Sequence, residues 1–294
     1  MPPSFDWSRR LSGYWQLIRI DRPIGIYLLL WPTLWALWFA GEGQPDWQVV
    51  FIFVLGTMLM RSAGCAINDY ADHHVDGHVE RTRQRPLVTG QVAPGEALAI
   101  AILLLLLAGS LLWWLNTPTR WHALVAVVLA TIYPFSKRYM PLPQLVLGIA
   151  FAWAIPMAFS ALQGATSALT WLLFSAVVAW TIAYDTVYAM MDREDDRKIN
   201  IQSSAILFGR YDRLAIGVLQ GLVILLLGIV GWLAARGGIY GLGLVIGVGF
   251  FVYQQGLLRR RERDAYFRAF LNNHPFGLVI CAALILDYWV YPTE

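Results

Sequence analysis

The sequence predicts an all-α integral membrane protein with about nine transmembrane helices in one bundle. Hydrophobic residues make up 58% of the chain and charged residues only 14%, whereas soluble domains are about 25% charged. Apolar runs long enough to cross a bilayer recur along the whole chain. Lys and Arg are concentrated in alternate loops, which is typical of a multi-pass membrane protein.

The amino-terminal segment, residues 5–20, is amphipathic. It mixes Trp, Tyr and Leu side chains with Arg9, Arg10 and Arg19. We expect an interfacial helix that lies on the inner membrane surface with its apolar face in the lipid. We interpret residues 1–294 as a single membrane-embedded domain that includes this helix.

The apolar runs follow this segment in order, and each could form one span. The fourth run is the shortest. The predicted spans are residues 24–40, 49–67, 97–115, 121–134, 142–162, 169–188, 214–235, 239–258 and 276–290.

The basic residues predict the orientation of these spans. With the amino terminus inside, every Lys and Arg except Arg61, Arg120 and Arg236 lies in a segment on the inner side. The basic segment 259–268 is then the last inner loop, and the carboxyl terminus is outside. This sorting also accounts for the net charge of +3, so we expect no nucleic-acid partner. No transit peptide is evident, which favours a bacterial inner (cytoplasmic) membrane.

The second span ends in an acidic motif. Asn68, Asp72 and Asp76 follow one another at four-residue spacing, so on a helix their side chains share one face spread over roughly 80°. A divalent cation bound to a phosphate would explain three oxygen-bearing side chains on one stripe. Mg²⁺ in particular is usually held by one or two carboxylates plus phosphate oxygens.

A second acidic motif ends the sixth span. Asp192 and Asp196 are four residues apart, and Asp185 lies on the same face two turns deeper. Each motif alone could be a solvated, charged helix end, but two motifs in matching positions favour two sets of metal ligands facing one diphosphate. Both motifs are expected on the cytoplasmic side.

The matching motifs indicate an internal duplication. Gly90 follows Asp76 by 14 residues, and Gly209 follows Asp196 by 13 residues. We interpret spans two to five and six to nine as two quasi-repeated four-helix units, with span one as an addition.

Cations near the motifs could bind the phosphates or a carboxylate. Arg22 fits a snorkelling membrane anchor equally well, and Lys137 and Arg138 also obey the positive-inside rule. A metal ion and a diphosphate would relieve the repulsion among the clustered carboxylates. The metal would stabilise negative charge on a departing diphosphate, and a dry, aromatic-lined cavity would protect the allylic cation that remains.

With these motifs the chain resembles the UbiA superfamily of intramembrane aromatic prenyltransferases. The resemblance covers about residues 22–288, and its carriers are segments 21–25, 64–72 with 76–79, 133–139, 184–196 and 205–209. The family's two metal motifs match Asn68, Asp72, Asp76, Asp192 and Asp196. His73, His74 and Asn200 depart from the family pattern, but none of them stands at a metal-ligand position.

The resemblance implies transfer of a polyprenyl chain from polyprenyl diphosphate to the ring carbon beside the hydroxyl of 4-hydroxybenzoate, a reaction of ubiquinone biosynthesis. Two Mg²⁺ ions held by the two motifs would bind the diphosphate, and Asp185 would orient or deprotonate the phenol. The implied catalytic residues are Asp72, Asp76, Asp185, Asp192 and Asp196. The implied substrate-binding residues are Arg22, Asn68, Arg85, Tyr133, Lys137, Arg138 and Tyr184.

Two other functions fit the same residues. A different member of the superfamily would use haem, homogentisate or a dihydroxynaphthoate as the acceptor. A cation transporter would also carry intramembrane acids, but most of the acids here stand at helix ends on one side of the membrane and not at its midplane.

Overall fold

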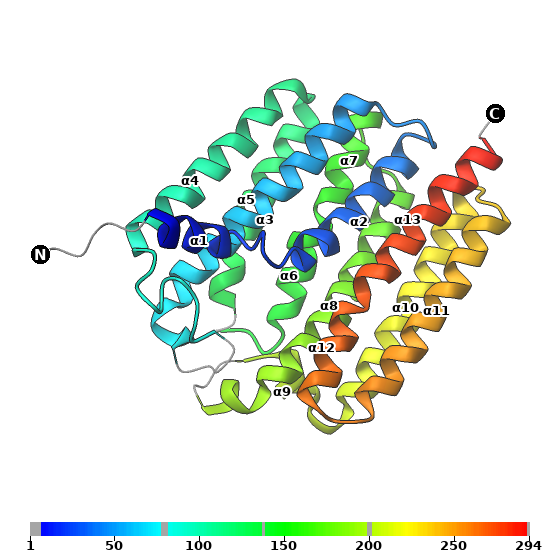
Figure 1. Ribbon diagram of the computed structural model, residues 1–294. Coiled ribbons are helices and arrows are strands. Elements are labelled where there is room, and N and C mark those ends of the chain that lie inside the picture. Colours follow the sequence, from blue (N-terminus) through cyan, green and yellow to red (C-terminus); the bar gives the residue numbers. More distant parts are fainter. Residues whose placement is uncertain (1–6, 78–81, 137–138, 199–201, 293–294) are drawn as a thin grey trace, which may run out of the picture.

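The computed structural model describes residues 7–77, 82–136, 139–198 and 202–292, and within these ranges every regular element is a helix (Figure 1). The α-helices are α1 (Trp7–Leu17), α2 (Ile24–Ala40), α3 (Trp47–Asp76), α4 (Pro94–Leu111), α5 (Thr117–Ser136), α6 (Pro143–Ala152), α7 (Ala154–Gln163), α8 (Ala168–Lys198), α9 (Ser204–Phe208), α10 (Asp212–Leu233), α11 (Gly238–Leu258), α12 (Arg263–Leu271) and α13 (Asn273–Val290). Two short 3₁₀ helices, η1 (Leu112–Trp114) and η2 (Gly209–Tyr211), complete the order.

Each predicted span corresponds to a helical segment of the bundle. In the part of the chain that the structure describes, 7 helical segments are long and apolar enough to cross a membrane. The first predicted span, α2, is a shorter apolar helix of 17 residues. The fourth, α5, is not among the 7 because Arg120 and His122 make its first turns polar.

The bundle core lies where α2, α8 and α13 meet. The rings of Trp35 and Trp180 stack with centroids 5.2 Å apart, and Phe276 packs 5.1 Å from Trp180. All three side chains are almost fully buried. Each indole N–H has an acceptor, Gly277 O at 3.1 Å for Trp35 and Asn273 Oδ1 at 2.9 Å for Trp180. The core is therefore both closely packed and hydrogen-bonded, as a buried Trp requires.

The two longest helices bring the acidic motifs to one end of the bundle. Helix α3 has 30 residues and α8 has 31, and each carries its motif in its last turns. Figure 1 shows the carboxyl-terminal ends of both helices at the same end as α9 and α12, with the carboxyl terminus of the chain at the opposite end. The two motifs thus lie on one side, as predicted.

The basic segment 259–268 was expected to be a loop, and that expectation is wrong. Most of it belongs to α12, which buries Ala265, Tyr266 and Ala269 against the bundle. Apolar side chains at these spacings let a short helix form despite the flanking arginines. The last helix of each expected four-helix unit is broken, at Trp153 between α6 and α7 and at Asn272 between α12 and α13. This parallel supports the internal duplication, which stays a prediction.

Candidate active site

One cavity of about 850 Å³ collects the candidate residues from both halves of the chain. It is lined mainly by α2, α3, α5, α6, α8 and α12 and by the segment that follows α3. The predicted site residues that line it are Arg22, Asn68, Asp72, Asp76, Arg85, Tyr133, Tyr184, Asp185, Asp192 and Asp196. Lys137 and Arg138, also predicted, lie outside the described residues.

The first acidic motif occupies the last turns of α3. The amide oxygen of Asn68 is buried and has no hydrogen-bond partner within the described residues. Asp76 is buried and accepts a 2.6 Å hydrogen bond from Arg85. Burial raises the pKa of the Asp76 carboxyl above its usual range, and the Arg85 guanidinium opposes this rise. An oxygen without a donor beside buried carboxylates is the arrangement expected of a cation site.

The second acidic motif faces the same cavity from α8. Asp192 is buried, and Asp196 lies one turn further on and is half-buried. Two turns deeper, Asp185 is half-buried and lines the cavity beside Tyr184. The Tyr184 hydroxyl is buried without a hydrogen-bond partner in the described part of the chain. The deeper part of the cavity therefore presents one acid and one hydroxyl to a ligand.

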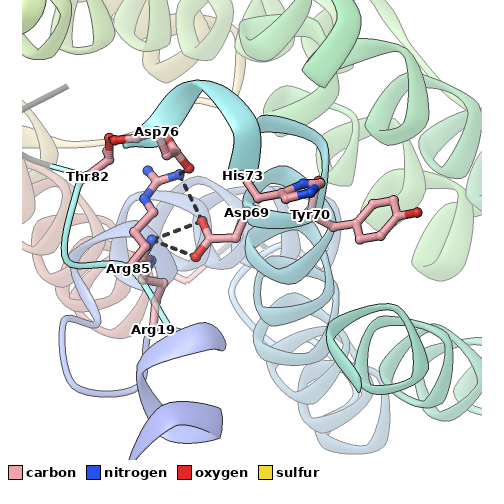
Figure 2. A network of polar contacts seen from close by, with 7 residues as sticks. All are labelled: Arg19, Asp69, Tyr70, His73, Asp76, Thr82 and Arg85. Atoms are coloured by element: carbon pink, nitrogen blue, oxygen red, sulfur yellow. Dashed lines mark hydrogen bonds and ion pairs between the residues drawn. The ribbon is translucent and has the colours of Figure 1, made fainter. Parts of the chain in front are cut away.

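Two arginines and two aspartates, one of which is Asp76 of the first motif, form a network near the end of α3 (Figure 2). Arg85 lies between Asp69 and Asp76, 3.0 Å from an oxygen of Asp69. Arg19, from the link between α1 and α2, donates to both oxygens of Asp69 at 3.0 and 3.1 Å. Arg19 and Asp69 are not among the site residues that the sequence predicts. Their pairing joins positions 50 residues apart, which helix periodicity does not reveal.

Arg61 is a further cavity residue that the sequence reasoning left without a role. It lies on α3 seven residues before Asn68, and therefore on the same face. Its Nε is buried without a partner in the described structure, and its guanidinium lies 5.7 Å from the ring centroid of Phe151. Gly25 leaves space for it, because a Cβ at that position would lie 2.6 Å from Nε. The spacing from Asn68 was the feature that could have identified it.

Arg22 has a more peripheral place than the other predicted cations. Its side chain is 78% exposed and lies 3.6 Å from Asp21. It lines the cavity all the same. Both sequence interpretations, a membrane anchor and a cation facing the ligand, fit this position.

The donor set suits Mg²⁺ bound together with a phosphate. The predicted ligands are all oxygen donors on one cavity. Among the described residues, no three His, Cys, Asp or Glu side chains lie close enough to hold a metal ion alone. Mg²⁺ keeps several waters and is usually held by one or two carboxylates plus substrate oxygens. Two separate pairs of aspartates fit that mode, and the assignment of individual ligands stays a prediction.

Comparison with known proteins identifies the family. A model of the UbiA prenyltransferase family matches residues 29–292. This protein belongs to the UbiA prenyltransferase family. It is a multi-pass membrane protein and is 54% identical over 280 residues to the 4-hydroxybenzoate octaprenyltransferase of Chromohalobacter salexigens, with 95% of this chain and 94% of that protein covered. The protein of the same name from Methylococcus capsulatus is 53% identical over 279 residues, covering 95% and 96%.

Solved structures of UbiA homologues share the fold. The apo homologue from Aeropyrum pernix K1 has a TM-score of 0.78 at 24% identity, covering 88% of this chain and 97% of its own. The homologue from Archaeoglobus fulgidus bound to GPP and Mg²⁺ has a TM-score of 0.72 at 18% identity, covering 95% and 99%. The predicted all-helical prenyltransferase fold is thereby confirmed.

Proposed function

We propose that this protein transfers a long polyprenyl chain from polyprenyl diphosphate to 4-hydroxybenzoate in ubiquinone biosynthesis. The product is 3-polyprenyl-4-hydroxybenzoate, and diphosphate is released. The observation that carries the proposal is that both acidic motifs line one cavity in a chain 54% identical, over 95% of its length, to a 4-hydroxybenzoate octaprenyltransferase. The same identity favours an eight-unit donor.

The acidic end of the cavity suits the diphosphate of the donor. Asn68, Asp72, Asp76, Asp192 and Asp196 would hold Mg²⁺, which supplies positive charge to the leaving diphosphate when bound. Arg85 lies at this end, where it donates to Asp76. It would also bind the diphosphate, because a guanidinium makes stronger hydrogen bonds to charged oxygens than to neutral ones.

The apolar walls suit the polyprenyl chain. Leu105, Leu112 and Val127 line the cavity on the side formed by α4, η1 and α5. These walls contain no charged side chain among their described lining residues, so they would exclude water from the allylic cation formed when the C–O bond to diphosphate breaks.

Arg61 and Asp185 suit the two ends of the acceptor. A buried guanidinium is costly without an anionic partner, and the carboxylate of 4-hydroxybenzoate would supply one for Arg61. Asp185 would accept a hydrogen bond from the phenol, or its proton, which raises the electron density of the ring carbon next to the hydroxyl. That carbon attacks the allylic cation, a C–C bond forms, and the ring proton then passes to the released diphosphate.

The test is a transfer assay on the protein in membranes with octaprenyl diphosphate and 4-hydroxybenzoate, with and without Mg²⁺. The proposal predicts octaprenylated 4-hydroxybenzoate only with Mg²⁺. Product formed only from homogentisate or a dihydroxynaphthoate would show that the acceptor is not 4-hydroxybenzoate. Cation flux across proteoliposomes without prenyl transfer would show that the protein is a cation transporter and not a prenyltransferase.

The bacterial relatives and the positive-inside pattern support a proposal for the cellular location. We expect the bacterial inner membrane, with the active-site end facing the cytoplasm. Recovery in an outer-membrane fraction of the native host would contradict this location.

A further inference from the structure

Two buried aspartates in this fold are each held between two arginines. Asp69, 2% exposed, contacts Arg19 and Arg85. Asp212 is fully buried and contacts Arg193 and Arg261, the latter through both oxygens at 2.7 and 2.6 Å. One cluster stands beside the first acidic motif, and Arg193 of the other directly follows Asp192 of the second motif.

The two clusters differ in what their arginines face. Arg19, Asp69 and Arg85 all line the cavity that holds the acidic motifs. Arg193, Asp212 and Arg261 do not line it. The Asp69 cluster is therefore exposed to a ligand, whereas the Asp212 cluster joins α8, α10 and the link before α12 outside the cavity.

Asp69 is placed to hold arginines and not a metal ion. On α3 it lies about 100° from Asn68 but only about 20° from Asp76, which follows it by seven residues, so its contacts and not its direction set it apart from the motif. Both of its oxygens are already within 3.1 Å of guanidinium nitrogens.

The backbone holding Arg19 is unusual. Its φ of +59° is a conformation that non-glycine residues rarely adopt, and such conformations persist only where the surrounding contacts fix them. The contacts here are the pair with Asp69 and the Ser62 hydroxyl, which donates to the neighbouring Ile18 carbonyl at 3.3 Å. Arg85 is fixed similarly, in the turn where Thr82 donates to the Asp76 carbonyl at 2.7 Å.

We propose that Asp69 is a positioning residue that presents Arg19 and Arg85 together to the diphosphate of the donor. The inference rests on the proposed function, since it assigns the ligand that the two guanidinium groups meet. It makes the link between α1 and α2 part of the donor site. A diphosphate offers several charged oxygens, and two guanidinium groups fixed by one carboxylate bind it without first having to be ordered.

The test compares Asp69→Asn with Asp212→Asn, which removes the same charge from the cluster outside the cavity. For Asp69→Asn we expect the KM for octaprenyl diphosphate to rise about tenfold or more, the size expected from a weakened charged hydrogen bond. The KM for 4-hydroxybenzoate stays unchanged. Asp212→Asn lowers the thermal unfolding temperature but leaves the donor KM at the wild-type value. Asp69→Glu restores part of the donor affinity because it keeps the carboxylate.

A second measurement does not depend on turnover. Inorganic diphosphate with Mg²⁺ is expected to raise the unfolding temperature of wild type and Asp212→Asn, and to raise that of Asp69→Asn much less. A wild-type donor KM together with a wild-type shift in Asp69→Asn would overturn the inference. So would a raised Mg²⁺ requirement at unchanged donor KM, because Asp69 would then be a metal ligand.

Arg19→Gln covers the case in which Asp69→Asn does not fold. It should raise the donor KM to a similar extent, and an unchanged donor KM would overturn the inference. Where both single variants fold, the donor KM of the double variant should be no higher than the larger of the two single-variant values. Both changes act on the same pair of guanidinium groups held by Asp69. If wild type itself forms no prenylated 4-hydroxybenzoate, the proposed function fails, and not only the role assigned to Asp69.

Discussion

At the residue scale, the proposed role of Arg61 depends on its immediate surroundings in the cavity. Its Nε has no partner in the described structure, and Gly25 lies directly against it. We predict that Gly25→Ala raises the KM for 4-hydroxybenzoate by about tenfold, because the new Cβ displaces the guanidinium that we propose binds the acceptor carboxylate. Steady-state kinetics with varied acceptor give the value.

Gly95→Ala is the matched control for that change. Nothing lies within 4 Å of the Cβ it would add, so its kinetics should equal those of wild type. If Gly25→Ala also leaves the acceptor KM unchanged, Arg61 does not bind the carboxylate of the acceptor.

The aspartates of the two motifs give a second prediction at this scale. Asp72→Ala or Asp192→Ala should abolish prenyl transfer while leaving the protein folded. Each change removes an expected ligand of the Mg²⁺ that would stabilise negative charge on the leaving diphosphate. Glu194→Ala is the control, since Glu194 is exposed and does not line the cavity. Full activity in either aspartate variant would remove the metal assignment.

At this scale the sequence predicts the site residues that a single helix brings together. Asn68, Asp72 and Asp76 share a face of α3 because helical periodicity requires it, and all three line the cavity. The pairs of Asp69 with Arg19 and Arg85 depend on how separate segments pack, and no periodic pattern encodes that.

At the scale of elements, the junction between α12 and α13 is held by one side chain. Asn273 accepts from Trp180 and donates to the carbonyls of Ala269 and Phe270, both at 3.1 Å. This fixes α12, whose Phe267 and Phe270 line the cavity.

We therefore predict that Asn273→Leu destabilises the protein by about 1–2 kcal/mol, the range found in model peptides for hydrogen bonds between membrane helices. The lost bonds leave the Trp180 N–H without its acceptor inside the bundle. Thermal unfolding in detergent measures the change, with Leu271→Ala as a control at a partly exposed position of α12. Equal unfolding temperatures for wild type and Asn273→Leu would contradict it.

The helix ends were harder to predict than the helices. The apolar runs located the spans, but α12 was taken for a loop because its arginines masked four small or aromatic residues that pack inward. Burial against neighbouring helices decided its structure, and the sequence shows that only indirectly.

At the scale of the whole molecule, the orientation is the main open prediction. A cysteine introduced at Glu42 should react with a membrane-impermeant thiol reagent from the outer side, and one introduced at Arg197 from the inner side. Both positions are on the surface, whereas the native Cys65 and Cys281 are buried and should stay unreactive. Labelling of intact spheroplasts and inverted vesicles distinguishes the two sides, and the reverse pattern would contradict the orientation.

The arrangement of the bundle explains why the chemistry is gathered at one end. Helices α3 and α8 are both long enough to cross a membrane and carry their acids beyond the apolar part. The polar cavity mouth and the apolar interior are thus continuous, as a charged diphosphate on a long hydrocarbon chain requires.

The most direct test of the central claim is prenyl transfer by the wild-type protein in membranes, measured with octaprenyl diphosphate and 4-hydroxybenzoate at varied Mg²⁺. The account predicts octaprenylated 4-hydroxybenzoate and equimolar diphosphate, both dependent on Mg²⁺ and both lost in Asp72→Ala. Transfer that persists without any divalent cation, or no transfer and no diphosphate release by folded protein, would contradict it.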